Sequence, residues 1–415
     1  MAYVEQEVGS GLPQGFLWGA VRAGIKVSGN PDVAVAVVPR GAVAAAMYTK
    51  NRVVAAPVTV GRRHMAATGG RVSAVIVNAG NANCATGEAG IEGCVKTCVA
   101  AAETFGCIFD EVFPSSTGII GVPFPADKVV AAMPAAKAAL GGDIEHAEAF
   151  ATAILTTDTK KKVARAVIDV DGTDVRIFGV CKGAGMIYPQ LGAPVAPKGL
   201  PHATMLVYLF TDLLAEAAQL RALMVDAVEG SFNSISIDGD TSTNDTVLLL
   251  ASGASGVKLT ERVTEAFESA LKLVCGSLAH QIVDDGEGVG HVVTLAISGA
   301  KTVADAKTVA KAIAHSPLCK TAWSSADPNW GRLLAAAGYS GVEFNPAKVT
   351  VRIGGLPVFE GGMRSAAFDE AAAHEAMLSR EYTIEIDLGE GDAECRFLTC
   401  DLTEEYVRIN ADYST

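Results

Sequence analysis

Residues 199–212 read GLPHATMLVYLFTD, a Gly/Pro-rich loop that leads through Ala203 and Thr204 into an apolar run. Gly and Pro interrupt regular structure, and the apolar and β-branched residues that follow predict a buried strand. A threonine that opens such a strand is often only a β-branched residue that suits a pleated sheet. It can also be a hidden nucleophile, exposed when the chain is cut in front of it.

The segments around this loop predict an α/β protein. Short apolar runs bounded by turns indicate strands, whereas apolar residues at three- and four-residue steps indicate helices. Strands are predicted over 32–39, 41–49, 72–83, 204–212 and 245–253, and helices over 91–106, 124–142, 144–158, 213–233 and 260–285. Pro134 leaves open whether the second and third of these helices are separate or one interrupted helix.

Turn-forming residues divide the rest of the chain. A hairpin is predicted over 161–185, because the pair Asp171-Gly172 favours a tight turn between two strands. Residues 186–202 contain four of the 16 prolines, so we predict an irregular loop there. From about residue 300 the pattern again alternates between helix and strand.

Composition excludes several classes of function. The 33 Lys and Arg residues against 46 Asp and Glu give a net charge of −13, which disfavours nucleic acid and anionic membranes as partners. The 50% apolar and 6% aromatic content with 43 glycines is typical of a compact α/β protein. The acidic N-terminus lacks a secretion signal and no long uncharged apolar run is present, so we expect a cytoplasmic protein.

Metal and disulfide sites are not expected. Nine cysteines without a secretion signal do not suggest a disulfide framework. Cys94, Cys98 and Cys107 lack a fourth ligand, so packing in the core is the better interpretation. The stretch 238–249 places Asp at the first and third positions of a calcium loop, but Leu249 stands where the bidentate Glu belongs. A polar turn is the simpler interpretation.

The remaining chemistry points to Thr204. The chain has no G-x-S-x-G elbow, P-loop or H-E-x-x-H motif, and its seven histidines are scattered. An N-terminal threonine can still transfer acyl groups, with its hydroxyl as nucleophile and its own α-amine, of pKa about 7.7–8.0, as base. The loop that ends at Ala203 would allow the cut that releases this amine.

Ten short motifs together resemble the ornithine acetyltransferase (glutamate N-acetyltransferase) family of self-cleaving enzymes of arginine biosynthesis. They occur in the family's order over nearly the whole chain, so the match is far more specific than any single motif. They are AGIK (23–26), NAGNAN (78–83), SSTGIIG (115–121), ILTTDT (154–159), KGAGMI (182–187), ATML (203–206), DGDTSTNDT (238–246), DGEG (285–288), NWGR (329–332) and YVRINADYST (406–415).

This resemblance implies specific roles. Thr204 would be the nucleophile, and the bond between Ala203 and Thr204 would be cleaved. The Thr117 hydroxyl and the Gly118 amide would form the oxyanion hole, which is what acyl transfer requires. The residues implied in substrate binding are Thr156, Lys182, Thr204, Glu287, Asn410 and Thr415. In this assignment Lys182 suits a carboxylate and Glu287 suits the ornithine ammonium.

Two departures from the family pattern affect these roles. The spacing from Lys182 to Thr204 is 204 − 182 = 22 residues, longer than the family usually has, with the extra segment within 191–202. Long surface loops cost little free energy, so the insertion should affect the cleavage rate more than the position of the nucleophile. After DGEG the family usually continues with Ala-Thr-Lys, whereas this chain has Val289, Gly290 and His291, which can alter substrate preference.

The resemblance therefore implies a layered α/β fold, with two sheets between helices and a smaller C-terminal α/β domain at about 300–415. We expect an α chain of residues 1–203 and a β chain of residues 204–415, with two copies of each in the assembly. The expected reaction is ping-pong transfer of the acetyl group from N²-acetylornithine to glutamate, without a metal or other cofactor. Whether acetyl-CoA is a further donor stays open.

Two other functions remain as alternatives. An N-terminal-threonine amidohydrolase or aminopeptidase would use the same groups, with water in place of glutamate. A non-enzymatic binder of small acidic metabolites would stay a single uncut chain.

Overall fold

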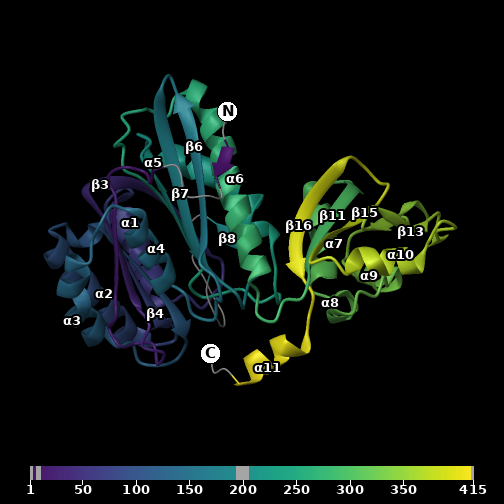
Figure 1. The fold of residues 1–415 in the computed structure, drawn as a ribbon, viewed down its shortest axis with the longest axis horizontal. Helices are drawn as coiled ribbons and strands as arrows, with labels where there is room; N and C mark the ends of the chain where they lie inside the picture. The colour runs from purple at the N-terminus through teal and green to yellow at the C-terminus, as the bar shows by residue number, and fades with distance from the viewer. Residues whose placement is uncertain (1–2, 6–10, 193–204, 413–415) are drawn as a thin grey trace. The chain divides into compact units, whose positions relative to one another are not determined.

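The protein divides into two compact units. In the computed structural model, residues 3–5, 11–192 and 205–412 are described. The first unit comprises residues up to 233 together with 241–282, and the second comprises 234–240 together with 283–414. Figure 1 shows that each unit has its own sheet and its own helices, and we describe each by itself.

The sheet of the first unit contains ten strands. Its order is β1-β6-β7-β9-β10-β3-β4-β5, and β2 and β8 also pair with β3. The strands are β1 (Tyr3–Glu5), β2 (Leu17–Val21), β3 (Val33–Thr49), β4 (Arg71–Asn81), β5 (Val112–Ile119), β6 (Lys162–Val170), β7 (Thr173–Lys182), β8 (Leu191–Gly192), β9 (Leu206–Thr211) and β10 (Thr246–Ala251). β3 spans 17 residues and carries a register shift between Val37 and Ala42, so it joins both halves of the sheet.

Helices cover both faces of this sheet. They are α1 (Ala56–Ala67), α2 (Gly87–Phe105), α3 (Ala126–Ala138), α4 (Ile144–Ala153), α5 (Ala217–Glu229) and α6 (Glu261–Asp284). Alternate residues of β3 contribute to different cores: Ala34 packs in a cluster with Phe150 of α4, and Val33 packs in a cluster with Cys98 of α2. Strands buried on both faces account for the long Val/Ala runs of the sequence. The predicted layered α/β fold is confirmed.

The strand that begins after Thr204 is buried along its whole length. All six residues of β9 are buried, as the apolar run predicted. β9 pairs antiparallel with β7, where Leu206 faces Lys182, and parallel with β10, where Leu206 faces Thr246. The start of β9, the end of β7 and the start of β10 therefore meet at one edge of the sheet.

The second unit is the smaller α/β body predicted for the C-terminal part. Its sheet has the order β14-β13-β12-β15-β11-β16, and α7 packs on β11 and β16 (Figure 1). The strands are β11 (Val292–Ala300), β12 (Thr350–Ile353), β13 (Leu356–Glu360), β14 (Met363–Arg364), β15 (Glu381–Asp387) and β16 (Ala393–Cys400). The helices are α7 (Val303–Ala314), α8 (Pro317–Ser324), α9 (Trp330–Gly338), α10 (Glu370–Met377) and α11 (Glu404–Asp412).

Several local predictions can be compared with the structure. The turn between β6 and β7 has Asp171 at φ 54° and Gly172 at φ 83°, as the hairpin prediction requires. α3 and α4 are separate helices, and Pro134 lies inside α3. The prediction of an irregular loop over 186–202 was wrong at β8, because Leu191 and Gly192 pair with Thr49 and Tyr48. The helix α1 was not predicted.

The cysteines confirm the core-packing interpretation. All nine are free, and Cys94 and Cys98 are buried in the core between α2 and the sheet. In the described part of the chain, no helix is both long enough and apolar enough to cross a membrane. The described residues also contain no group of three or more His, Cys, Asp or Glu arranged to hold a metal ion.

Candidate active site

The predicted site residues fall into three sets. Thr117, Gly118, Thr156 and Lys182 lie in the first unit, and Glu287 and Asn410 lie in the second. Ala203, Thr204 and Thr415 lie outside the described residues. For these three positions the structure describes only nearby residues of the chain.

Thr117 and Gly118 form the end of β5, in a backbone arrangement that only glycine fits. Thr117 is 1% exposed, and its Oγ1 has no hydrogen-bond partner among the described residues. Gly118 has φ 126°, and a Cβ there would lie 2.4 Å from the backbone carbon of Gly80. Buried hydroxyls normally have partners, so an unpartnered one requires an explanation. A donor held in reserve for a bound oxyanion provides one.

Three of the sequence motifs meet around this strand end. Ser116 Oγ donates to Asn78 Oδ1 over 2.6 Å, which joins β5 to the NAGNAN motif at the end of β4. Asn244 Nδ2 donates to Ser116 O over 2.9 Å and to Ala82 O over 2.8 Å. A side chain of the TNDT segment thus fixes the backbone on the N-terminal side of Thr117.

The neighbouring Asp245 holds the start of β9. Its Oδ1 accepts a hydrogen bond of 2.7 Å from the amide of Met205, the residue that follows Thr204. Asp245 is completely buried, and its Oδ2 has no hydrogen-bond partner among the described residues. Burial raises the pKa of Asp245 to about 7, against the opposing effects of the Met205 amide, of Ser242 and of the charge on Lys182.

Thr156 and Lys182, both proposed to bind substrate, are in direct contact. Lys182 Nζ donates to Thr156 Oγ1 over 2.9 Å, and Lys182 is only 3% exposed. Asp158, two residues after Thr156, lies 3.5 Å from Lys182 Nζ and accepts hydrogen bonds from the amides of Thr156 and Gly183. The Asp158 carboxylate therefore links the segment around Thr156 to the end of β7.

A second lysine completes this buried charge cluster. Lys162 Nζ lies 2.7 Å from Asp158 Oδ1, and its side chain is 1% exposed. Although burial raises the pKa of Asp158, the charges of Lys182 and Lys162 with two hydrogen bonds outweigh it and hold that pKa well below its ordinary value. Two buried ammonium groups thus contact the same carboxylate.

Lys26 of the AGIK motif belongs to the same neighbourhood. Its Nζ donates to the carbonyls of Pro31 and Ala153, and Asp32 accepts from the amides of Ala23, Ile25 and Lys26, which shapes the turn. Burial, together with the charge of Lys182 and against the charges of Asp32 and Asp158, lowers the pKa of Lys26 to about 8. The motif adds positive potential near Lys182.

In the second unit, Glu287 and Asn410 are also in contact. Asn410 Nδ2 donates to Glu287 Oε2 over 2.9 Å and to Tyr406 O over 3.0 Å. The glycine after Glu287 is required, because a Cβ on Gly288 would lie 2.5 Å from the Tyr406 amide nitrogen. α11 thus holds Asn410 against the DGEG turn.

The unusual segment 289–291 is anchored through its backbone. The amides of Gly290 and His291 both donate to Asp401 Oδ1, over 2.9 and 3.0 Å, and Nδ1 of His291 lies 2.9 Å from Ser379 O. A Cβ on Gly290 would approach Asp401 Oδ2 to 2.6 Å. Gly290 in place of the family's threonine therefore allows close packing on Asp401.

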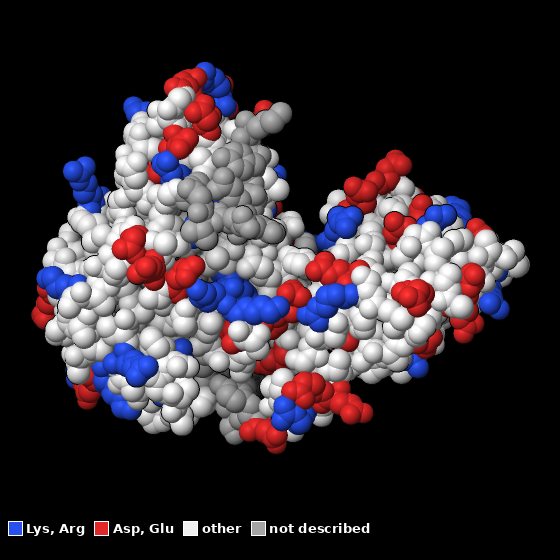
Figure 2. Space-filling view, in the orientation of Figure 1, with Lys and Arg blue, Asp and Glu red and all other residues white. Residues whose placement is uncertain are grey.

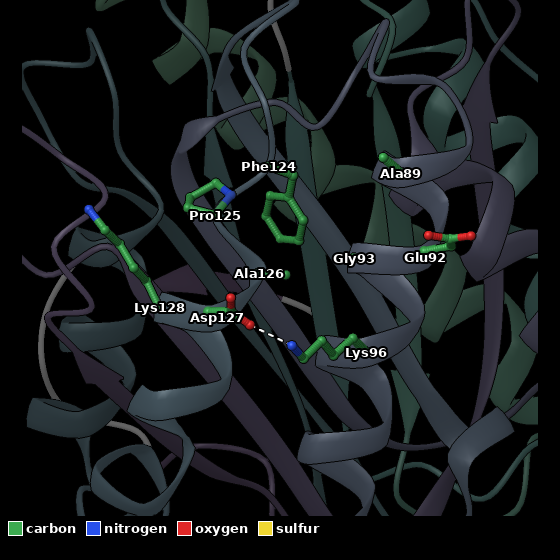
Figure 3. A pocket seen from close by; sticks show the side chains of 9 residues that line it. All are labelled: Ala89, Glu92, Gly93, Lys96, Phe124, Pro125, Ala126, Asp127 and Lys128. Atoms are coloured by element: carbon green, nitrogen blue, oxygen red, sulfur yellow. Dashed lines mark hydrogen bonds and ion pairs between the residues drawn. The ribbon is translucent and has the colours of Figure 1, made fainter.

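A pocket elsewhere on the surface lacks the groups that acyl transfer requires. A pocket of about 480 Å³ lies between α2 and the start of α3 (Figure 3). Phe124 faces its centre, and the Lys96–Asp127 pair at its edge is exposed to solvent. Figure 2 shows acidic and basic side chains intermixed on the visible surface of each unit. Neither feature provides a nucleophile with an oxyanion donor.

Sequence reasoning left four buried polar residues without a role: Asp158, Lys162, Asn244 and Asp245. Asp158, Asn244 and Asp245 lie inside motifs that match the family, so the motif matches already covered their positions. What the sequence could not show is that their partners are Lys182, Ser116 and Met205, which lie 24 or more residues away along the chain.

Comparison with known proteins agrees with the motif pattern. A family model described as the ArgJ family matches residues 17–415. The arginine biosynthesis bifunctional protein ArgJ of Thermus thermophilus is 44% identical over 404 residues, which cover 97% of this chain and 99% of that protein. The protein of the same name from Methylococcus capsulatus is 41% identical, covering 97% and 95%. A solved structure of ArgJ from Bacillus halodurans, 37% identical, covers 50% of this chain and 98% of its own, with a TM-score of 0.48.

Proposed function

Since the chain belongs to the ArgJ family and is a glutamate N-acetyltransferase of arginine biosynthesis, we propose that it works through an acetylated Thr204. The donor is N²-acetylornithine and the acceptor is glutamate. The observation that carries this proposal is the buried hydroxyl of Thr117 beside Gly118 near the end of β5, which has no hydrogen-bond partner within the described ranges. An acyl-transfer site needs such a donor, and a purely structural turn does not.

Maturation comes first. The Thr204 hydroxyl attacks the carbonyl carbon of Ala203, a C–O bond forms and the C–N bond breaks, and the hydroxyl proton moves to the amine that leaves. Water then hydrolyses the ester, which gives the Ala203 carboxylate and a free Thr204 with its α-amine.

Acetyl transfer then proceeds in two halves. The Thr204 α-amine takes the hydroxyl proton as the oxygen attacks the acetyl carbon, and the Thr117 hydroxyl and Gly118 amide stabilise the tetrahedral oxyanion. Ornithine departs with that proton on its α-nitrogen. The amine of glutamate attacks the acetyl-threonine by the same route, which releases N-acetylglutamate and restores the enzyme.

Substrate recognition follows from charge. Donor and acceptor share an α-carboxylate, and the buried ammonium group of Lys182, held beside Asp158, suits it. Thr156 adds a hydroxyl beside Lys182. In the second unit Glu287 supplies the anion for the ornithine side chain, with Asn410 holding its carboxylate and Thr415 as a further contact.

The mass of the purified protein under denaturing conditions tests the nucleophile. We expect two fragments of 203 and 415 − 203 = 212 residues, and N-terminal sequencing of the second should give Thr-Met-Leu-Val. A single full-length chain that still transfers acetyl groups would exclude this mechanism. Hydrolysis of N²-acetylornithine at the rate of transfer to glutamate would instead indicate an amidohydrolase.

Three finer points belong to the same proposal. The relatives are named bifunctional, so we propose acetyl-CoA as a second donor, to be measured by acetylglutamate formation without acetylornithine. An assembly of two α and two β chains is the expected form, which light scattering can test. Nine unpaired cysteines are consistent with a reducing compartment, and we propose the cytoplasm.

A further inference from the structure

Glu287 lies at the tip of a tight turn whose geometry depends on glycine. The amide of Val289 donates to Gly286 O over 3.1 Å, which closes a β-turn with Glu287 at its first central position. Gly288, at the second central position, has φ 69°, the left-handed conformation that a type II turn requires there. The position of the Glu287 side chain therefore depends on what holds this short backbone segment.

The strands beside this turn bring further residues to the same edge of the sheet. The turn leads into β11, and β15 and β16 lie on either side of that strand (Figure 1). β15 runs parallel to β11 with Glu381 opposite Val292, and β16 runs antiparallel with Cys400 opposite Val292. Residues just before β15 and just after β16 therefore lie next to the turn.

Arg380, the residue before β15, connects the two ends of the turn segment. Its Nη2 donates to Asp284 O over 2.6 Å and to Asp284 Oδ1 over 2.8 Å, and its Nε donates to the same carboxylate oxygen over 3.2 Å. Its Nη1 donates to Val289 O over 2.7 Å and to Gly290 O over 2.8 Å. The guanidinium group thus binds the chain on both sides of Glu287. A lysine cannot reproduce this, since its ammonium group has one nitrogen and no planar fork.

Thr403, just after β16, holds the centre of the turn. Its Oγ1 donates to Gly288 O over 2.6 Å and accepts from the Tyr406 amide over 3.4 Å. These two bonds tie the turn to α11, the helix that carries Asn410. Within the described residues the Glu287 carboxylate accepts one hydrogen bond, from Asn410 to Oε2, so Oε1 is available to a ligand.

We propose that Arg380 and Thr403 are positioning residues, which fix the turn so that the Glu287 carboxylate binds the side-chain ammonium of the acetyl donor. This rests on the proposed function, in which Glu287 recognises ornithine. A shift of about 1 Å is enough to weaken a short charge-assisted contact, so loss of either residue should weaken use of the donor. Glutamate has no side-chain ammonium, so the second half-reaction should not depend on them.

The substitutions Arg380→Lys and Thr403→Val test the proposal. The first keeps the charge and loses the fork, and the second keeps the shape and loses the hydroxyl. Each should raise, by about threefold or more, the N²-acetylornithine concentration that gives half the maximal rate of acetyl-enzyme formation. The rate of discharge by glutamate should stay within about twofold of the wild-type rate.

Two further variants serve as controls. Thr403→Ser keeps the hydroxyl, so it should use the donor like the wild type, which a loss of packing alone would not explain. Arg352→Lys should also match the wild type. Arg352 is another exposed arginine of the second unit that donates to a backbone carbonyl, Gly355 O, but its turn holds no proposed site residue.

A double-mutant cycle shows whether Arg380 and Thr403 act through Glu287. In the Glu287→Gln background, Arg380→Lys and Thr403→Val should change the half-saturating donor concentration by less than about twofold, because the contact that they position is already lost. An unchanged donor dependence in the single variants, equal losses in both half-reactions, or an undiminished loss in the Glu287→Gln background would each overturn the proposal.

The same measurements separate this proposal from the proposed function. If Arg380→Lys does not fold, Thr403→Val and Thr403→Ser decide by the same criteria. A Glu287→Gln variant that uses N²-acetylornithine as well as the wild type does would instead refute the role of Glu287 in the proposed function. The two failures are therefore distinguishable.

Discussion

The carboxylate of Asp158 lies 2.7 Å from the ammonium of Lys162, and both side chains are inaccessible to solvent, at 0% and 1% exposure. Lys182 Nζ approaches the same carboxylate to 3.5 Å and also donates to Thr156. Two buried cations thus contact the same buried anion. Asp158 fixes the position of Lys182 Nζ, which we propose binds the substrate carboxylate.

Replacing Asp158 should therefore cost both stability and substrate affinity. Asp158→Asn removes the buried carboxylate charge that both ammonium groups contact, and we expect a loss of about 3–5 kcal/mol in the free energy of unfolding. The KM for both substrates should rise. Urea unfolding at pH 7 measures the first effect. Asp127→Asn is the control: its carboxylate also contacts a lysine, Lys96, but is 87% exposed, so a change within about 0.5 kcal/mol is expected.

The difference in the free energy of unfolding between the wild type and Asp158→Asn should shrink as the pH falls. The pKa of Asp158 is lower in the folded state than in the unfolded chain. Its contribution to stability is therefore complete above the unfolded value near 4 and is lost as the pH falls toward the folded value. The wild type and Asp158→Asn should converge in stability below about pH 4. A difference that stays constant down to pH 2 would contradict the assignment.

Thr117→Val tests the oxyanion donor with almost no change in shape. The hydroxyl has no partner among the described residues, so its removal should leave the melting temperature unchanged or slightly raised. We expect kcat to fall by about 10²–10³-fold. Ser115→Ala is the control, because Ser115 Oγ, two residues earlier on β5, is also buried without a hydrogen-bond partner in the described part of the chain and has no proposed catalytic role. Equal kcat values for both variants would remove Thr117 from the mechanism.

The sequence predicted β9, β10 and the β6–β7 hairpin because each carries its own local pattern. The apolar run after Thr204 and the Asp171-Gly172 turn need no tertiary information. α1 was missed because its apolar face is weak: Arg62, Arg63 and His64 interrupt it, although Pro57 near its start favours a helix. β8 was missed because two residues acquire strand geometry only by pairing with the end of β3.

The candidate site was predictable only in part. Motif matches identified Thr117, Lys182 and Glu287, and the structure places Lys182 against Thr156 and Glu287 against Asn410. The supporting residues were not assigned, since a motif does not show which of its polar side chains contacts a distant strand. Asn244 contacts a carbonyl 128 residues away, and only the fold shows that pairing.

His315 should make the second unit sensitive to mild acid. Burial lowers the pKa of His315 to about 4, with the charges of Lys320 and Lys311 acting in the same direction, and its Nε2 lies 3.0 Å from Ser236 Oγ. The unfolded chain binds a proton near pH 6.5, before the folded protein does. Stability from neutral His315 is therefore present above pH 6.5 and is lost as the pH falls toward 4.

His315→Gln removes this titration and tests its size. Between pH 6.5 and 4 the variant should lose less stability in urea unfolding than the wild type does. Above pH 7 the difference between the two proteins should not depend on pH. Parallel stability curves from pH 7 down to pH 4 would show that His315 titrates alike in both states.

Thr204→Ala and Thr204→Ser separate maturation from folding. The alanine variant lacks the hydroxyl, so it should remain one chain of 415 residues and transfer no acetyl groups. The serine variant keeps the hydroxyl but loses the methyl group that restricts χ1, so it should be cut slowly and keep reduced activity. Intact mass and acetyl transfer measure the two effects. Cleavage at residue 203 in the alanine variant would mean that another group attacks.

The two half-reactions should distinguish Lys182 from Glu287. In the proposed assignment Lys182 binds the α-carboxylate that donor and acceptor share, so Lys182→Met should impair acetyl-enzyme formation and its discharge by glutamate alike. In the same assignment Glu287 attracts the ornithine ammonium, and it would repel the side-chain carboxylate of glutamate. Glu287→Gln can still accept the hydrogen bond from Asn410, so the turn should keep its shape. It should therefore slow formation from N²-acetylornithine by about tenfold or more, with little effect on discharge. Rapid-mixing measurements with each substrate alone resolve the steps, and equal losses in both for Glu287→Gln would assign Glu287 to the shared carboxylate end instead.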